Sequence, residues 1–356
     1  MSLLKPHVAT GDAAASAAPE RDIPRPSPLL AVEHLTKRFA LKGGLIGGTR
    51  SVVQAVDDVS FVVERGETLG IVGESGCGKS TTARLLMHLI KPDRGSIVFD
   101  GQTVGAAEGL SHRQLHRQMQ MVFQDSYASL NPRLTIVETL AFAPRAHGLA
   151  AAAAKTRARD LLAQVGLDPK NFADRYPHEL SGGQRQRVNI ARALALQPRL
   201  VILDEAVSAL DKSVEAQVLN MLVDLKRELG LTYLFISHDL NVVQYLSDRV
   251  LVMYLGKIVE IGDVDAIYDR PQHPYTRALL SARPSMDPRR RTREAPIQGD
   301  PPNPIDPPSG CRFRTRCPFA EDVCAKAEPP LTQAAAQSVA CHMSAPGSGH
   351  SRARRI

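Results

Sequence analysis

The stretch 68–81 holds residues whose types and spacing suit phosphate binding. It contains the pattern Gly73-x-x-x-x-Gly78-Lys79-Ser80 between an apolar run and a segment of helical periodicity, which predicts a strand, a loop and a helix. The glycines let backbone N–H groups face a phosphate, and the helix start adds its positive end. Lys79 could reach the β- and γ-phosphates of a nucleotide, and the Ser80 hydroxyl could ligate Mg²⁺. The predicted nucleotide-binding residues of this stretch are Gly73, Glu74, Ser75, Gly76, Cys77, Gly78, Lys79, Ser80 and Thr81.

Two neighbouring carboxylates, Asp204 and Glu205, follow the apolar run 200–203. This run predicts a buried parallel strand, and ligands of open α/β sheets bind at the carboxyl ends of such strands. Two carboxylates without a partner there would be costly to desolvate. In a metal and phosphate site, Asp204 would hold the Mg²⁺ shell and Glu205 would orient or deprotonate the attacking water. The alternative is a carboxylate that caps the next turn.

Two other predicted strands end in polar side chains that could reach the same site. Gln124 could bridge Mg²⁺ or water, although a single Gln is usually a surface amide. His238 could contact the γ-phosphate as a neutral imidazole, although a single His is more often a hydrogen-bonded core residue. Neither residue identifies a site by itself.

A second helix start suited to phosphate lies at Ser181, Gly182, Gly183 and Gln184. Ser181 is a predicted N-cap, and the two glycines expose backbone N–H groups. One nucleotide needs only one such cradle, so the second cradle indicates two chains.

The order of the predicted elements favours an α/β fold, with helices on both faces of a mostly parallel sheet. Residues 29–63 alternate as in an antiparallel sheet, and hairpins are expected at Asp100-Gly101 and around Gly256. We expect a disordered leader over 1–28, a core domain over 29–263 with a helical insert at about 125–190, and a C-terminal region over 264–356.

The charge distribution and the lengths of the apolar runs argue against two classes of protein, nucleic-acid-binding and membrane-spanning. The formal net charge is +7, and most of the excess lies from Arg283 onward, where Arg289–Arg291 and Arg352–Arg355 are expected to be solvated runs. No recognition motif accompanies this charge, so we expect no nucleic-acid partner. No apolar run approaches the ~18 residues that span a bilayer, and no signal peptide precedes the core.

These motifs together resemble the ATPase subunit of ABC transporters. The resemblance covers about residues 29–262 and adds Leu180, Leu203 and Ser208-Ala209-Leu210-Asp211 to the residues above. It implies a P-loop NTPase (RecA-like) core with an antiparallel β subdomain and the helical insert, and ATP and Mg²⁺ as ligands. It also implies a head-to-tail pair of ATPase subunits, with ATP between the P-loop of one and Ser181–Gln184 of the other. Phe39 resembles the aromatic residue that stacks on adenine.

The C-terminal region resembles that of ATPases serving dipeptide and oligopeptide importers. The resemblance rests on His273-Pro274-Tyr275-Thr276-Arg277, on G-D-P-P-N-P and on the cysteine segment, and the loop at Gly43–Gly48 is similar too. It implies peripheral attachment to the cytoplasmic face of the bacterial inner membrane, a second ATPase subunit, two membrane permeases and a solute-binding protein. Related systems carry nickel, glutathione or opines, and the alternatives are a soluble non-transport ABC ATPase or an exporter ATPase.

Five cysteines remain. Cys77 is expected to be a small packing residue, although the helix start beside it could lower the pKa of its thiol. The other four are gathered in the tail, where disulfides are not expected in a cytosolic ATPase. Their spacing lacks the C-x-x-C pairs of common zinc sites, and zinc or free thiols stay open. The resemblance to peptide-importer ATPases implies a four-iron four-sulfur cluster held by Cys311, Cys317, Cys324 and Cys341.

Overall fold

The computed structural model describes residues 27–41, 51–283, 299–300, 302–334 and 336–353. A central sheet carries the parallel strands β3 (Thr68–Val72), β6 (Met119–Val122), β7 (Leu200–Asp204), β8 (Thr232–Ile236) and β9 (Arg249–Tyr254). Antiparallel strands β10 (Lys257–Asp263), β12 (Gln337–Val339) and β11 (Thr332–Ala334) continue it, in the order β11-β12-β10-β9-β3-β8-β7-β6. The predicted mostly parallel sheet is confirmed.

The middle strands of this sheet are mostly apolar. Every residue of β3, β7 and β8 is buried, as expected of strands covered on both faces. On one face lie α7 (Lys212–Leu229), α8 (Leu240–Leu246) and α9 (Val264–Asp269). On the other face, α1 (Lys79–Leu86) fills the space between this sheet and a second one. The carboxyl ends of the strands are thereby held in fixed register.

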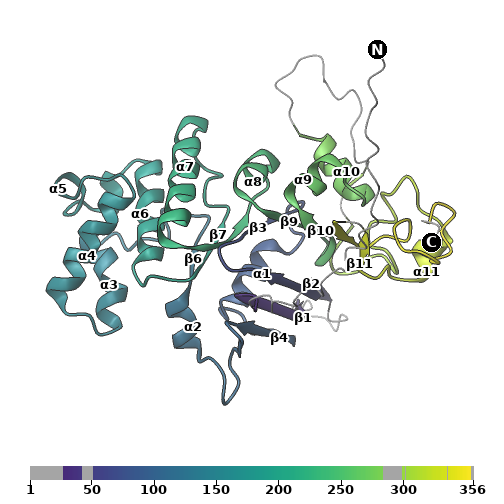
Figure 1. Cartoon of the computed structure of the whole chain (residues 1–356), viewed down its shortest axis with the longest axis horizontal. Coiled ribbons are helices and arrows are strands. Elements are labelled where there is room, and N and C mark those ends of the chain that lie inside the picture. The colour runs from purple at the N-terminus through teal and green to yellow at the C-terminus, as the bar shows by residue number, and fades with distance from the viewer. Residues whose placement is uncertain (1–26, 42–50, 284–298, 301, 335, 354–356) are drawn as a thin grey trace, which may run out of the picture.

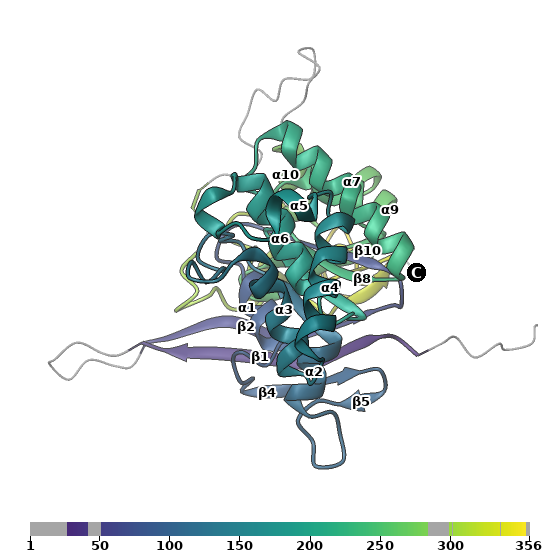
Figure 2. The ribbon, with the colours of Figure 1, turned by 90° about the vertical axis from the view of Figure 1, so that its left-hand side faces the viewer.

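The second sheet is antiparallel, with strand order β2-β1-β4-β5. Its strands are β1 (Leu30–Ala40), β2 (Val52–Val63), β4 (Arg94–Phe99) and β5 (Gln102–Thr103). The β4–β5 hairpin turns at Asp100-Gly101, and the β9–β10 hairpin turns at Leu255-Gly256, as the sequence predicts. The short helix α2 (His112–Gln118) leads into β6. Figure 2 shows β1 and β2 running beneath the helices.

The helical insert lies at one end of the molecule (Figure 1). It contains α3 (Ile136–Ala146), α4 (Ala151–Gln164), α5 (Pro169–Phe172), a 3-10 turn at Pro177–Glu179 and α6 (Gly182–Leu194). Apolar residues of α3, α4 and α6 are buried in one cluster with side chains of β6, β7 and α7. Because these side chains pack together, a motion of the insert would be transmitted to strands β6 and β7.

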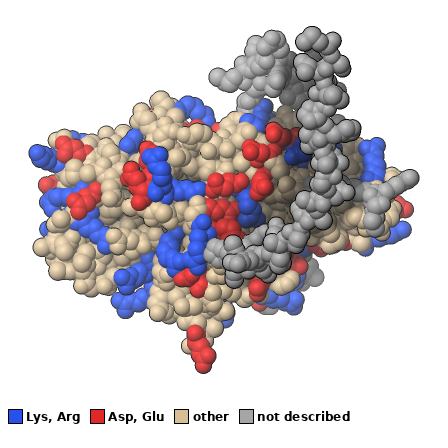
Figure 3. Space-filling view, in the orientation of Figure 1, with Lys and Arg blue, Asp and Glu red and all other residues tan. Residues whose placement is uncertain are grey.

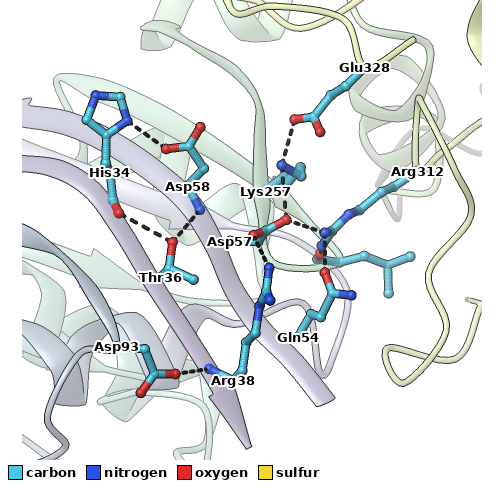
Figure 4. A network of polar contacts seen from close by, with 11 residues as sticks. His34, Thr36, Arg38, Gln54, Asp57, Asp58, Asp93, Lys257, Arg312 and Glu328 are labelled. Carbon is cyan, nitrogen blue, oxygen red and sulfur yellow. Dashed lines mark hydrogen bonds and ion pairs between the residues drawn. The ribbon is translucent and has the colours of Figure 1, made fainter. Parts of the chain in front are cut away.

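The C-terminal region lies at the opposite end, and contains α10 (Pro274–Ser281) and α11 (Asp322–Lys326). Backbone pairing of β12 with β10 joins it to the central sheet. A polar network, drawn in Figure 4, joins it to β2: Arg312 contacts Asp57 and donates to the Gln54 amide oxygen at 2.8 Å. Lys257 bridges Asp57 at 3.1 Å and Glu328 at 2.6 Å. These charges fix the region against the core.

Some expectations fall on parts of the chain that the structure does not describe. Most of the leader 1–28 lies outside the described residues, as do the loop at Gly43–Gly48 and the run Arg289–Arg291. Over the face shown in Figure 3, Lys and Arg are interspersed with Asp and Glu.

Candidate active site

The phosphate-binding stretch forms a loop between β3 and α1. Gly76 and Gly78 have φ angles of 78° and 110°, which strain any residue that has a Cβ. A Cβ on Gly78 would also lie 2.4 Å from the backbone oxygen of Ala55. Helix α1 begins directly after Gly78, so its positive end lies at the loop. The loop is thus shaped by glycine and polarised toward an anion.

Lys79 occupies the inside of this loop. Its ammonium donates to the backbone oxygens of Gly73 at 2.7 Å and of Glu74 at 3.1 Å, and the residue is only 6 % exposed. These carbonyls are neutral, as is the Cys77 thiol that lies 3.8 Å from the ammonium. A phosphate would offer the ammonium a charged acceptor in their place, and hydrogen bonds to charged groups are stronger.

Asp204 lies at the end of β7 and faces the loop. The Ser80 hydroxyl donates to its carboxylate, with 2.9 Å between Oγ and Oδ1. Burial raises the pKa of Asp204, the Ser80 hydrogen bond opposes that shift, and the neighbouring Glu205 charge adds to it. A hydroxyl and a carboxylate oxygen suit Mg²⁺, which binds one or two carboxylates together with substrate phosphates. These two residues therefore fit the predicted metal site.

Glu205, Gln124 and His238 form one cluster. The Gln124 amide donates to Glu205, with 2.8 Å between Nε2 and Oε2. His238 Nδ1 lies 3.5 Å from the same oxygen. Glu205 has a φ of 49°, a region that non-glycine residues occupy only at a cost. Three strand ends thus converge on one carboxylate oxygen.

An open cavity of about 600 Å³ joins these groups. The predicted residues that line it are Phe39, Ser75, Gly76, Gly78, Lys79, Ser80, Thr81, Gln124, Glu205 and His238. Sequence reasoning missed Val53, Ala55 and Pro304, which line it too. Val53 and Ala55 belong to β2, whose alternation was visible in the sequence, whereas no local pattern marks Pro304. A polar inner end and an apolar rim at Phe39 suit a nucleotide.

Some of the predicted nucleotide-binding residues do not line this cavity. Gly73, Glu74 and Asp204 are not among the lining residues, although Asp204 holds Ser80 from behind. Cys77 is also absent from the lining and is 3 % exposed. Burial raises the pKa of its thiol, and Lys79 only partly opposes the shift. The buried position agrees with the packing role expected of Cys77, and its pKa is not lowered by the helix start because burial outweighs that effect.

The second cradle lies apart from the cavity. Ser181 is the N-cap of α6: its hydroxyl accepts from the Gln184 N–H at 3.4 Å, and the Gln184 side chain accepts from the Ser181 N–H at 2.9 Å. None of the four cradle residues lines the cavity. A Cβ on Gly183 would lie 2.4 Å from Val214, whereas one on Gly182 would meet nothing within 4 Å. Packing against Val214 explains why position 183 needs a glycine, but no contact among the described residues explains the glycine at position 182.

The four tail cysteines line one small cavity at the far end of the molecule. Burial raises the pKa of Cys311 to about 12 and that of Cys341 to about 11. Within the described part of the chain, no three His, Cys, Asp or Glu residues are grouped so that they could hold a metal ion. The predicted cluster is therefore not supported, because the cysteines share a cavity without forming a ligand set.

No helix among residues 27–41, 51–283, 299–300, 302–334 and 336–353 is long and apolar enough to cross a membrane.

Comparison with known proteins agrees with this geometry. A family described as ABC transporter matches residues 56–208, and one described as oligopeptide/dipeptide transporter, C-terminal region, matches residues 259–324. The chain is 52% identical over 320 residues to a probable peptide ABC transporter ATP-binding protein of Sinorhizobium fredii, which covers 89% of this chain and 90% of the relative. It is 48% identical over 320 residues to the oligopeptide transport ATP-binding protein AppF of Bacillus subtilis, which covers 88% and 97%.

A solved structure extends the likeness to three dimensions. It is a dimeric post-hydrolysis state of the ATP-binding cassette MJ0796 bound to ADP and phosphate. The match has a TM-score of 0.57 at 28% identity, and covers 66% of this chain and 98% of the other. The predicted P-loop ATPase fold is confirmed. The site geometry and these relatives together show that the chain belongs to the ABC transporter family, as an ABC-type ATPase.

Proposed function

We propose that this ATPase energises the import of peptides through a binding-protein-dependent ABC transporter. The observation that carries the proposal is the joining of an ABC-type site to a C-terminal region that matches oligopeptide and dipeptide transporters over residues 259–324. The relatives described above are named as peptide or oligopeptide transport proteins. An exporter or a non-transport ATPase would have no need of that region.

The proposed roles in the site follow from its contacts. Lys79 would exchange its two carbonyl acceptors for phosphate oxygens, and the loop N–H groups would bind the remaining phosphate charge. Ser80 and Asp204 would hold Mg²⁺, which neutralises charge on the phosphates. Glu205 would take a proton from water, with Gln124 and His238 orienting its carboxylate. Phe39 at the rim of the cavity would stack on adenine.

The second cradle would act on the nucleotide of a partner ATPase subunit. Ser181, Gly182, Gly183 and Gln184 lie away from the cavity of their own chain. The open space at Gly182 supports a contact from outside the chain. ATP would close such a pair and hydrolysis would reopen it. Gln124 lies between Glu205 and the helical insert, so this motion would pass to the permeases through the insert.

The proposed assembly comprises two ATPase subunits, two permeases and a solute-binding protein, with this chain at the cytoplasmic face of the inner membrane. Isolation of the chain from its native membrane in mild detergent, followed by mass spectrometry, tests it. Two multi-span permeases, a second ATPase and a binding protein are the expected companions. Recovery with nucleic acid or ribosomes and without membrane proteins would keep the ATPase but overturn the transport role.

The four-iron four-sulfur cluster stays a prediction that rests on the resemblance. The four cysteines line one cavity, but they form no metal-ligand set among the described residues. Iron and sulfide analysis of anaerobically purified protein decides the question. About four irons and four sulfides per chain would support the cluster, and their absence would remove it.

A further inference from the structure

The segment His273-Pro274-Tyr275 builds a helix start deep in the protein. His273 is 1 % exposed and is the N-cap of α10, where its Nδ1 accepts from the Tyr275 N–H at 3.0 Å. The Glu260 carboxylate of β10 accepts from the His273 N–H at 3.0 Å. Pro274 occupies the first turn, where its fixed φ suits a helix and its missing N–H is not needed. This start fixes the direction in which Tyr275 leaves the helix.

Tyr275 extends from this start to the phosphate-binding loop. Its ring is fully buried, with centroids 4.6 Å from Tyr254 and 5.4 Å from Phe313. Its hydroxyl oxygen accepts from the backbone N–H of Glu74 at 2.8 Å. The C-terminal region therefore makes a direct hydrogen bond to the loop that binds phosphate.

A second group of the same region reaches the side chain of Glu74. The Arg316 guanidinium donates to both carboxylate oxygens of Glu74, at 2.8 and 3.1 Å. The Arg316 side chain is 7 % exposed and that of Glu74 is 23 % exposed. Such a two-pronged pair is geometrically specific, and salt screens a partly buried pair only weakly. Arg316 thus binds the side chain of Glu74, and Tyr275 binds its backbone N–H.

Glu74 is linked to the nucleotide site through Lys79. The backbone oxygen of Glu74 is one of the two carbonyl oxygens that accept from the Lys79 ammonium. Its side chain does not line the cavity, so a role in direct contact with the nucleotide does not account for it. An unpaired Glu74 carboxylate would repel a bound phosphate, and the Arg316 guanidinium neutralises the charge of this carboxylate.

We propose that Arg316 and Tyr275 are positioning residues for the phosphate-binding loop, which act through Glu74 and set the affinity for ATP. The inference rests on ATP binding at this site. It gives the C-terminal region a part in the nucleotide site of its own chain: the docking of that region and the binding of ATP strengthen each other by the same factor.

The test uses full-length protein and measures the Kd for MgATP by equilibrium binding. Arg316→Ala should raise the Kd about tenfold, and Tyr275→Phe, which removes one oxygen, about threefold. Arg316→Lys keeps the charge but not the two-pronged geometry, so its Kd should lie between those of wild type and Arg316→Ala. The matched control is Arg314→Ala, because the Arg314 side chain bonds Ser309 in the same region. Its Kd should equal that of wild type.

A double-mutant cycle separates positioning from general stability. In a Glu74→Ala background, Arg316→Ala should change the Kd less than twofold, because its partner is already gone. An undiminished tenfold effect there, or wild-type Kd values for both Arg316→Ala and Tyr275→Phe, would overturn the inference. Tyr275→Phe carries the test by itself if Arg316→Ala does not fold. Wild-type protein that does not bind MgATP would instead overturn the assignment of the site.

Discussion

At the scale of single residues, the site depends on carboxylates placed at strand ends. Asp204 bonds Ser80, and Glu205 meets Gln124 and His238. The sequence predicts this convergence, because each of the three strands ends in a polar residue and parallel strands bring their carboxyl ends to one edge. The left-handed backbone of Glu205 could not be predicted, because no glycine or asparagine marks that position.

Glu205→Gln tests the general base. The amide keeps the size and hydrogen bonding of the side chain but cannot take a proton, so turnover should fall by about 10²- to 10⁴-fold while ATP still binds. Phosphate release and MgATP binding are measured on the same preparation. Turnover like that of wild type would contradict the role.

Ser80→Ala tests the metal site. Without the hydroxyl, the Mg²⁺ concentration for half-maximal ATP hydrolysis should rise roughly tenfold, because one oxygen ligand is lost. Ser80→Thr retains a hydroxyl and serves as the control, with a Mg²⁺ requirement close to that of wild type. An unchanged Mg²⁺ requirement in Ser80→Ala would exclude this residue as a ligand.

One residue-level result lay beyond sequence reasoning for a physical reason. Pro304 lines the cavity because its backbone oxygen accepts from the Gln54 N–H at 3.1 Å, a contact between residues far apart in the chain. This contact depends on tertiary packing, which local patterns do not encode. The burial of Cys77, by contrast, agrees with the packing role expected from the sequence, and it raises the pKa of the Cys77 thiol.

At the scale of elements, local signals predicted most of the core. Ser181 begins α6, and Gly230 ends α7 in the left-handed conformation. The hairpins at Asp100-Gly101 and Gly256 form as their turn residues require. The short strands β11 and β12 were missed, because three-residue strands carry too little periodicity.

The helix start at His273 gives an element-scale prediction of pH dependence. Burial lowers the pKa of His273 to about 3, below the value of about 6.5 in an unfolded chain. Between pH 6.5 and about 3, His273 is protonated in the unfolded chain but stays neutral in the folded chain. The free energy of unfolding should therefore fall by up to ~1.4 kcal/mol per pH unit as the pH drops from 6.5 toward 3.

His273→Asn is the matching variant, because asparagine is a good N-cap and does not titrate. Urea unfolding between pH 7.5 and 5 should show a shallower pH dependence in this variant than in wild type. Identical slopes would show that His273 does not control it.

At the scale of the whole molecule, the chain carries the candidate nucleotide cavity and the second cradle in separate places. Gly182→Leu tests whether that cradle serves a partner. A Cβ on Gly182 meets no described residue within 4 Å, and Gly182 is exposed, so thermal stability and MgATP affinity should stay within error of wild type. ATP hydrolysis by the assembled transporter should fall at least tenfold, because the side chain would enter the partner's site.

Ala152→Leu is the control for this variant, since Ala152 is also exposed on the helical insert. It should leave hydrolysis unchanged. Equal hydrolysis by Gly182→Leu and wild type would argue against a shared site.

The most direct measurement of peptide import uses the purified transporter in proteoliposomes, with the ATPase subunits facing outward and binding protein and labelled peptide inside. Import in the cell corresponds here to ATP-dependent release of peptide to the outside. We predict that release requires MgATP and binding protein, and that it is lost with Glu205→Gln in this chain. ATP hydrolysis that proceeds while peptide stays inside the vesicles, with or without binding protein, would contradict peptide import.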